Sequence, residues 1–116
     1  MRRLIFALIV MGLAFTSAKA STGNEVLEGC RLLAVTAFWP QAANSFRAGE
    51  CYGVLMTWAR EGRRLSGRVR SCIPSSVTAG QLAKVVVRFM DSEPSILNED
   101  FTGIVIAAFA LSWPCD

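Results

Sequence analysis

The 116-residue sequence contains no histidine. Histidine is the most common general acid–base residue, and it is the usual side chain that titrates near neutral pH. Its absence argues against an acid-triggered switch and against most hydrolytic enzymes. Glu99 and Asp100 do not replace it, because adjacent residues point to different sides of a helix; we expect them to complement a helix dipole instead. We therefore expect no catalytic residue and no cofactor.

The sequence also lacks closely spaced cysteines. Its four cysteines, Cys30, Cys51, Cys72 and Cys115, are separated by 20, 20 and 42 residues. Structural zinc sites use ligand pairs roughly two to four residues apart, and thioredoxin-like redox sites use C-x-x-C. Neither pattern occurs. We expect no metal site, and two structural disulfides are favoured if the chain leaves the reducing cytosol.

A run of apolar residues long enough to cross a membrane is missing as well. The apolar run from Leu4 to Phe15 has about a dozen residues, whereas a transmembrane helix needs roughly 20. It follows the basic pair Arg2-Arg3 and precedes Ala18-Lys19-Ala20, the small-x-small pattern of a cleavage site. We predict a cleaved signal peptide over residues 1–20 and an exported domain over residues 21–116 without a membrane anchor.

The positive charge of the chain lies in this leader. The chain has 12 Lys+Arg and 9 Asp+Glu, and Arg2, Arg3 and Lys19 leave with the leader. Nine basic and nine acidic residues remain, so the net charge of the mature chain is zero. Binding of nucleic acid needs a surplus of cations, so we expect no nucleic-acid partner. A chain without net charge has little long-range repulsion between copies.

Apolar residues recur every three or four positions along most of residues 21–116, as in amphipathic helices. We expect a first helix with Asn24 as its N-cap, ended by Pro40, and a second helix over about 44–60. With the two helices described next, the pattern predicts a small all-α domain of four helices, stapled by disulfides after a cleaved signal peptide.

The third helix has the clearest start signal. Thr78 and Gln81 have the spacing of a capping box, and Pro94 ends the helix. The fourth helix is predicted from near Asn98 to Trp113 and is apolar almost all round, so it is buried on most sides. We expect part of it to lie against a second copy in a homodimer; the alternative is a central helix covered by the other three.

Four cysteines allow three pairings, and the sequence alone does not select one. In an antiparallel hairpin of the first two helices, Cys30 and Cys51 lie at similar distances from the turn. In a hairpin of the last two helices, Cys72 and Cys115 lie at adjacent ends. This geometry favours the pairs Cys30–Cys51 and Cys72–Cys115.

The helical pattern is lost between Glu61 and Ser71, where a loop of about ten residues is expected. Guanidinium groups are frequent at binding hot spots and grip carboxylates in a fork. The loop is therefore a candidate partner-binding surface, and the alternative is a solvated surface loop. Its candidate binding residues are Arg63, Arg64, Arg68 and Arg70.

Several short motifs occur together in a recognisable order. They are Cys51-Tyr52-Gly53-Val54, Cys72-Ile73-Pro74, Val77-Thr78, Gln81-Leu82, Val86, Pro94 and Trp113-Pro114-Cys115. This order resembles the Rap/Tai family of periplasmic immunity proteins, over nearly the whole mature chain. Phe89-Met90 departs from the aromatic-leucine pair that is usual in the family, and the segment between Cys51 and Cys72 is unusually rich in arginine.

The resemblance implies a small helical, disulfide-bonded homodimer in the periplasm, without catalysis. Its implied partner is a cognate amidase effector of the type VI secretion system, a peptidoglycan hydrolase with a cysteine nucleophile, whose substrate groove the immunity protein blocks. The alternative function is that of a generic periplasmic helical binding or chaperone-like protein without a toxin partner.

Overall fold

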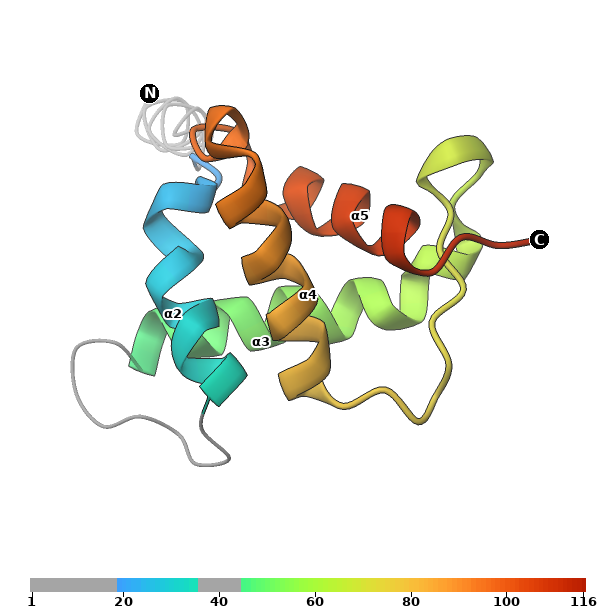
Figure 1. Ribbon diagram of the computed structural model, residues 1–116, viewed down its shortest axis with the longest axis horizontal. Coiled ribbons are helices and arrows are strands. Elements are labelled where there is room, and N and C mark those ends of the chain that lie inside the picture. Colours follow the sequence, from blue (N-terminus) through green and yellow to red (C-terminus); the bar gives the residue numbers. More distant parts are fainter. Residues whose placement is uncertain (1–18, 36–44) are drawn as a thin grey trace, which may run out of the picture.

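The computed structural model describes residues 19–35 and 45–116 (Figure 1). These ranges contain four α-helices: α2 (Gly23–Val35), α3 (Ser45–Glu61), α4 (Ala79–Ser92) and α5 (Phe101–Ser112). Three short 3₁₀ helices join them: η3 (Gly62–Arg64), η4 (Gly67–Val69) and η5 (Pro94–Ile96). The predicted all-α fold is confirmed. Nearly all of the predicted signal peptide lies outside the described residues, and none of the described helices is long and apolar enough to span a bilayer.

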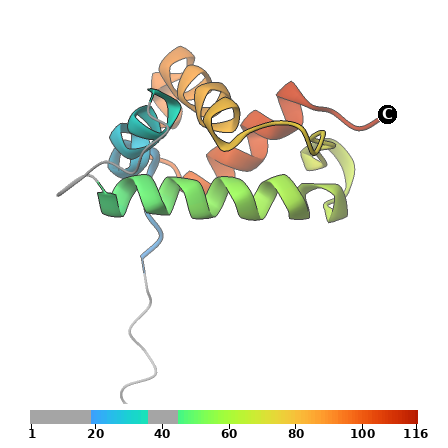
Figure 2. The ribbon, with the colours of Figure 1, turned by 90° about the horizontal axis from the view of Figure 1, so that it is seen from below.

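The helices lie in two layers. Figure 2 shows α3 along one side of the molecule, with α2, α4 and α5 on the other side. Helices α2 and α4 lie side by side and both contact α3. The core between the layers is built from aliphatic and aromatic side chains of all four helices, including Val26, Leu55, Leu82, Met90, Val105 and Phe109.

Helices α2 and α3 cross each other rather than forming an antiparallel hairpin (Figure 1). The Cys30–Cys51 disulfide joins them at the crossing, where both cysteines are fully buried and their Cα atoms are 5.4 Å apart. The crossing is close because Gly29 has no side chain: a Cβ atom there would lie 2.6 Å from the nitrogen of Ala48. The hairpin arrangement was therefore wrong, although the disulfide is the one that it suggested.

The start of α4 matches the sequence prediction. The N–H of Gln81 donates to the hydroxyl of Thr78 at 3.2 Å, and the N–H of Thr78 donates to the Gln81 side-chain oxygen at 2.8 Å. The helix ends at Ser92, two residues before Pro94. This capping box satisfies two backbone donors that an uncapped helix leaves without partners.

Replacing Thr78 with alanine is expected to lower the free energy of unfolding by about 1 kcal/mol, because one of these donors loses its acceptor. Thr57→Ala is a matched control, since Thr57 is an exposed residue inside α3 and alanine is the better helix former there. Urea unfolding monitored by circular dichroism measures both. Equal midpoints for the two variants would contradict the capping role.

Two helix starts differ from the prediction. Helix α2 begins at Gly23, so Asn24 lies inside the helix and is not its N-cap. Helix α5 begins at Phe101 rather than near Asn98, and Asp100 is its N-cap, accepting a hydrogen bond from the N–H of Gly103 at 3.1 Å. The backbone of residues 21–24 hydrogen-bonds to that of residues 97–101, which holds the chain before α5 in a non-helical path.

Helices α2 and α4 are joined by an ion pair on the surface. The guanidinium of Arg31 donates two hydrogen bonds to the carboxylate of Asp91, at 2.9 and 2.6 Å. It also donates to Glu28 at 3.1 Å. The hydrogen bonds from Arg31, first to Asp91 and then to Glu28, raise the pKa of the guanidinium further above its ordinary value. The two-pronged geometry fixes how α2 lies along α4.

Candidate protein-binding site

Residues 61–71, called here the arginine loop, leave the end of α3 and return to the body of the protein. Figure 1 shows the loop projecting beyond α3 beside the C-terminal segment. Its two ends meet: the carbonyl of Gly62 accepts hydrogen bonds from the N–H of Leu65 at 3.3 Å and from the N–H of Ser71 at 3.2 Å. The loop is therefore closed at its base like an Ω-loop.

The arginine loop contains regular turns, although its residues show no helical pattern of apolar positions. The 3₁₀ helices η3 and η4 each contribute one turn, and Leu65 and Ser66 between them are extended or bent. Gly67 has a φ angle of +66°, in the left-handed region that glycine adopts without steric cost. A helical repeat of apolar residues could not indicate these turns, because each turn has only three residues.

The base of the loop is tied to the C-terminal segment. Cys72 forms a disulfide with Cys115, and the N–H of Cys72 donates to the carbonyl of Trp113 at 2.8 Å. Ser71 forms an isolated β-bridge with Pro114 and is buried against Gly62, where a Cβ atom would collide with the hydroxyl of Ser71. These cross-links hold both ends of the loop in place.

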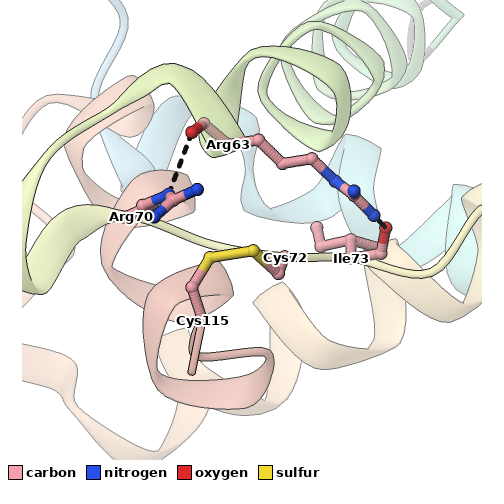
Figure 3. The surroundings of a disulfide bond; sticks show 5 residues. All are labelled: Arg63, Arg70, Cys72, Ile73 and Cys115. Carbon is pink, nitrogen blue, oxygen red and sulfur yellow. Dashed lines mark hydrogen bonds between the residues drawn. A yellow bond between two sulfur atoms is a disulfide. The ribbon is translucent and has the colours of Figure 1, made fainter.

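Two of the four candidate arginines brace the loop from within (Figure 3). The Nε of Arg70 donates to the carbonyl of Arg63 at 3.0 Å, so it links the two 3₁₀ turns. The Nη2 of Arg63 donates to the carbonyl of Ile73 at 3.3 Å, beyond the loop. Both side chains therefore help to set the shape of the loop, whatever else they contact.

The other two candidate arginines face outward. Arg64 pairs with Glu61 at 3.1 Å, but its side chain is 80% exposed. Arg68 is exposed, and it makes no hydrogen bond or ion pair with any other described residue. The tip of the loop thus presents at least one guanidinium that is available to a partner.

Two apolar residues of η4 and α5 are also exposed, and neither was among the predicted binding residues. Val69 in η4 is 47% exposed and Leu111 in α5 is 72% exposed. Helix α5 and η4 contact each other. The sequence offered one indication that Val69 is exposed, namely its position between Arg68 and Arg70. It offered none for Leu111, because α5 is apolar on almost all sides.

The arrangement is suited to contact with another protein. All four cysteines are in disulfides. Within residues 19–35 and 45–116, no group of three or more Cys, Asp or Glu side chains is placed to hold a metal ion. What the surface offers is a preformed loop that carries guanidinium groups, and arginine is among the residue types enriched at protein–protein hot spots.

The fold is that of a small disulfide-bonded helical protein, and the arginine loop is its candidate protein-binding surface. A family model described as Rap1a immunity proteins matches residues 22–115. The chain therefore belongs to the Rap1a immunity protein family, in agreement with the resemblance seen in its motifs. A comparison with curated proteins found no match, and a comparison with solved structures found none.

Proposed function

We propose that this chain is a periplasmic immunity protein that binds a peptidoglycan amidase of the type VI secretion system and blocks its active-site groove without catalysis. The observation that carries the proposal is the family match over residues 22–115, since immunity proteins act by binding an effector. Two disulfides fit an oxidising compartment such as the periplasm.

The arginine loop is the proposed blocking element. A loop that is ordered before binding loses little conformational entropy when it enters a groove. This loop is closed by the bond between Gly62 and Ser71 and held by the Cys72–Cys115 disulfide. Arg63, Arg64, Arg68 and Arg70 would supply positive charge toward the effector, with Arg68 as the foremost contact.

We also propose that the protein works as a homodimer that uses the outer side of α5. Leu111 is the second most exposed large apolar residue among the described ones, and Ala107 and Ala110 on the same helix are only half-buried. A second copy would cover this apolar surface. Light scattering of the purified protein at high concentration tests the dimer, and a strict monomer would contradict it.

Inhibition of a purified amidase tests the function. A peptidoglycan amidase whose gene lies beside that of this chain is mixed with the protein, and binding and peptidoglycan cleavage are both measured. We expect a stable complex and loss of cleavage at equimolar protein. Binding of many unrelated unfolded chains, with no effect on any amidase, would instead favour a generic chaperone-like protein.

Arg68→Glu is expected to weaken amidase binding at least tenfold, which corresponds to about 1.4 kcal/mol. The variant places a carboxylate where the proposed interface needs a cation, and it breaks no contact with the described residues. Arg88→Glu on α4 is the matched control, because Arg88 is also exposed and without a described partner. Calorimetric titration measures both. An unchanged affinity for Arg68→Glu would remove the loop tip from the interface.

A further inference from the structure

A second feature beside the arginine loop has a form suited to a ligand. A groove of about 460 Å³ opens between the last turns of α3, the segment after Cys72 and the start of α4. Its floor is apolar and includes Met56, Ile73, Val77 and Leu82. The volume lies within the range of about 300–1,000 Å³ that is usual for binding pockets.

The charge of the groove is of one sign. Arg60 and Arg63 line it, and none of the described residues that line it is acidic. Arg63 donates one hydrogen bond to the carbonyl of Ile73 (Figure 3). Arg60 has no hydrogen bond or ion pair with the described part of the chain. The groove therefore combines an apolar floor with guanidinium donors that have no carboxylate to pair with.

Another groove of the described structure differs in its charge. It lies between α4, η5 and α5, has a volume of about 230 Å³, and is lined by Phe89, Ile96, Glu99 and Asp100 among others. A negatively charged ligand would be repelled there and attracted to the groove of Arg60. The two grooves thus select occupants of opposite charge.

We propose that the groove of Arg60 receives an acidic segment of the effector, in which an Asp or Glu lies next to an apolar side chain. The apolar side chain would occupy the floor near Met56 and Leu82, and the carboxylate would accept hydrogen bonds from Arg60 and Arg63. Charge-assisted bonds of this kind are directional and strong. Because Arg63 belongs to both the groove and the arginine loop, one effector can contact both surfaces. The proposal rests on the proposed function and adds the chemistry of the partner.

A peptide titration tests the chemistry of the groove without the effector. The probe is the blocked peptide acetyl-Leu-Asp-Leu-amide, added to the ¹⁵N-labelled protein, and acetyl-Leu-Asn-Leu-amide is its uncharged match. We expect amide shifts at Ile73, Ser75 and Val77 with the Asp peptide, at least fivefold weaker binding of the Asn peptide, and loss of the preference in Arg60→Gln. Equal binding of the two peptides, or shifts confined to other residues, would overturn the proposal.

Binding to the effector separates this proposal from the proposed function. Arg60→Glu is expected to weaken the complex with the amidase at least tenfold, and Arg88→Glu to leave it unchanged. Full affinity of Arg60→Glu, with loss of affinity in Arg68→Glu, would overturn the groove and leave the immunity function standing. An Asp-selective peptide site in a protein that binds no amidase would support the groove and count against the immunity function. Thermal unfolding of each variant shows that it is folded.

Discussion

Gly29→Ala is expected to destabilise the protein by about 3 kcal/mol, at the upper end of the usual cost of overpacking. The added Cβ atom would lie 2.6 Å from the nitrogen of Ala48 and would also meet the carbonyl group of Arg47. These are backbone atoms of α3, so no side chain can turn away to make room. Helices α2 and α3 must separate, although the Cys30–Cys51 disulfide holds them together at this point.

Gly53→Ala is the control for this prediction. Gly53 also lies inside a helix, but a Cβ atom there would meet nothing within 4 Å. Alanine at this position is expected to stabilise the protein by roughly 0.5–1 kcal/mol, because it restricts the unfolded chain and favours the helix. Urea unfolding of both variants measures the change in the free energy of unfolding, which should be negative for Gly29→Ala and positive for Gly53→Ala. A stabilised Gly29→Ala protein would show that the crossing of α2 and α3 is looser than described.

Replacing both Cys72 and Cys115 with alanine is expected to lower the free energy of unfolding by about 4 kcal/mol in the chain-entropy account. The disulfide joins residues 43 positions apart, so its removal frees a long loop of the unfolded chain. It also removes the covalent tie at the base of the arginine loop. Amidase affinity should therefore fall even under conditions in which the variant remains folded.

The variant without Cys30 and Cys51 separates stability from binding. The Cys30–Cys51 disulfide that this variant lacks spans 21 positions, so the expected decrease in the free energy of unfolding is smaller, at about 3 kcal/mol in the chain-entropy account. This disulfide lies at the crossing of α2 and α3, away from the arginine loop. We expect this variant, when folded, to bind the amidase as the unaltered protein does. Equal loss of amidase affinity in the two folded double variants would contradict a specific role for the Cys72–Cys115 tie.

The sequence predicted those parts of the fold that depend on neighbouring residues. The capping box of Thr78 and Gln81 was found because its two members are three positions apart and the motif acts locally. The start of α5 was placed too early for the opposite reason. It is set by backbone hydrogen bonds from residues 21–24, about 75 positions away, and no local pattern encodes that contact.

The candidate site was predicted in composition but not in detail. The density of arginines between Glu61 and Ser71 indicated a binding loop. Which arginines brace it depends on the position of the Ile73 carbonyl and on the turn that brings Arg70 to Arg63, and both are set by the folded structure. The groove of Arg60 could not be predicted at all, because its walls come from three separate segments of the chain.

The attachment of the C-terminal segment to the base of the arginine loop has a practical consequence for experiments. The disulfide and the Cys72–Trp113 hydrogen bond hold this segment against the loop, and Figure 1 shows the terminus beside it. A purification tag or fluorescent protein fused after Asp116 would therefore crowd the surface that we propose meets the effector. Affinities measured with such fusions would come out too weak, and surface-immobilised protein captured through that end would present the wrong side.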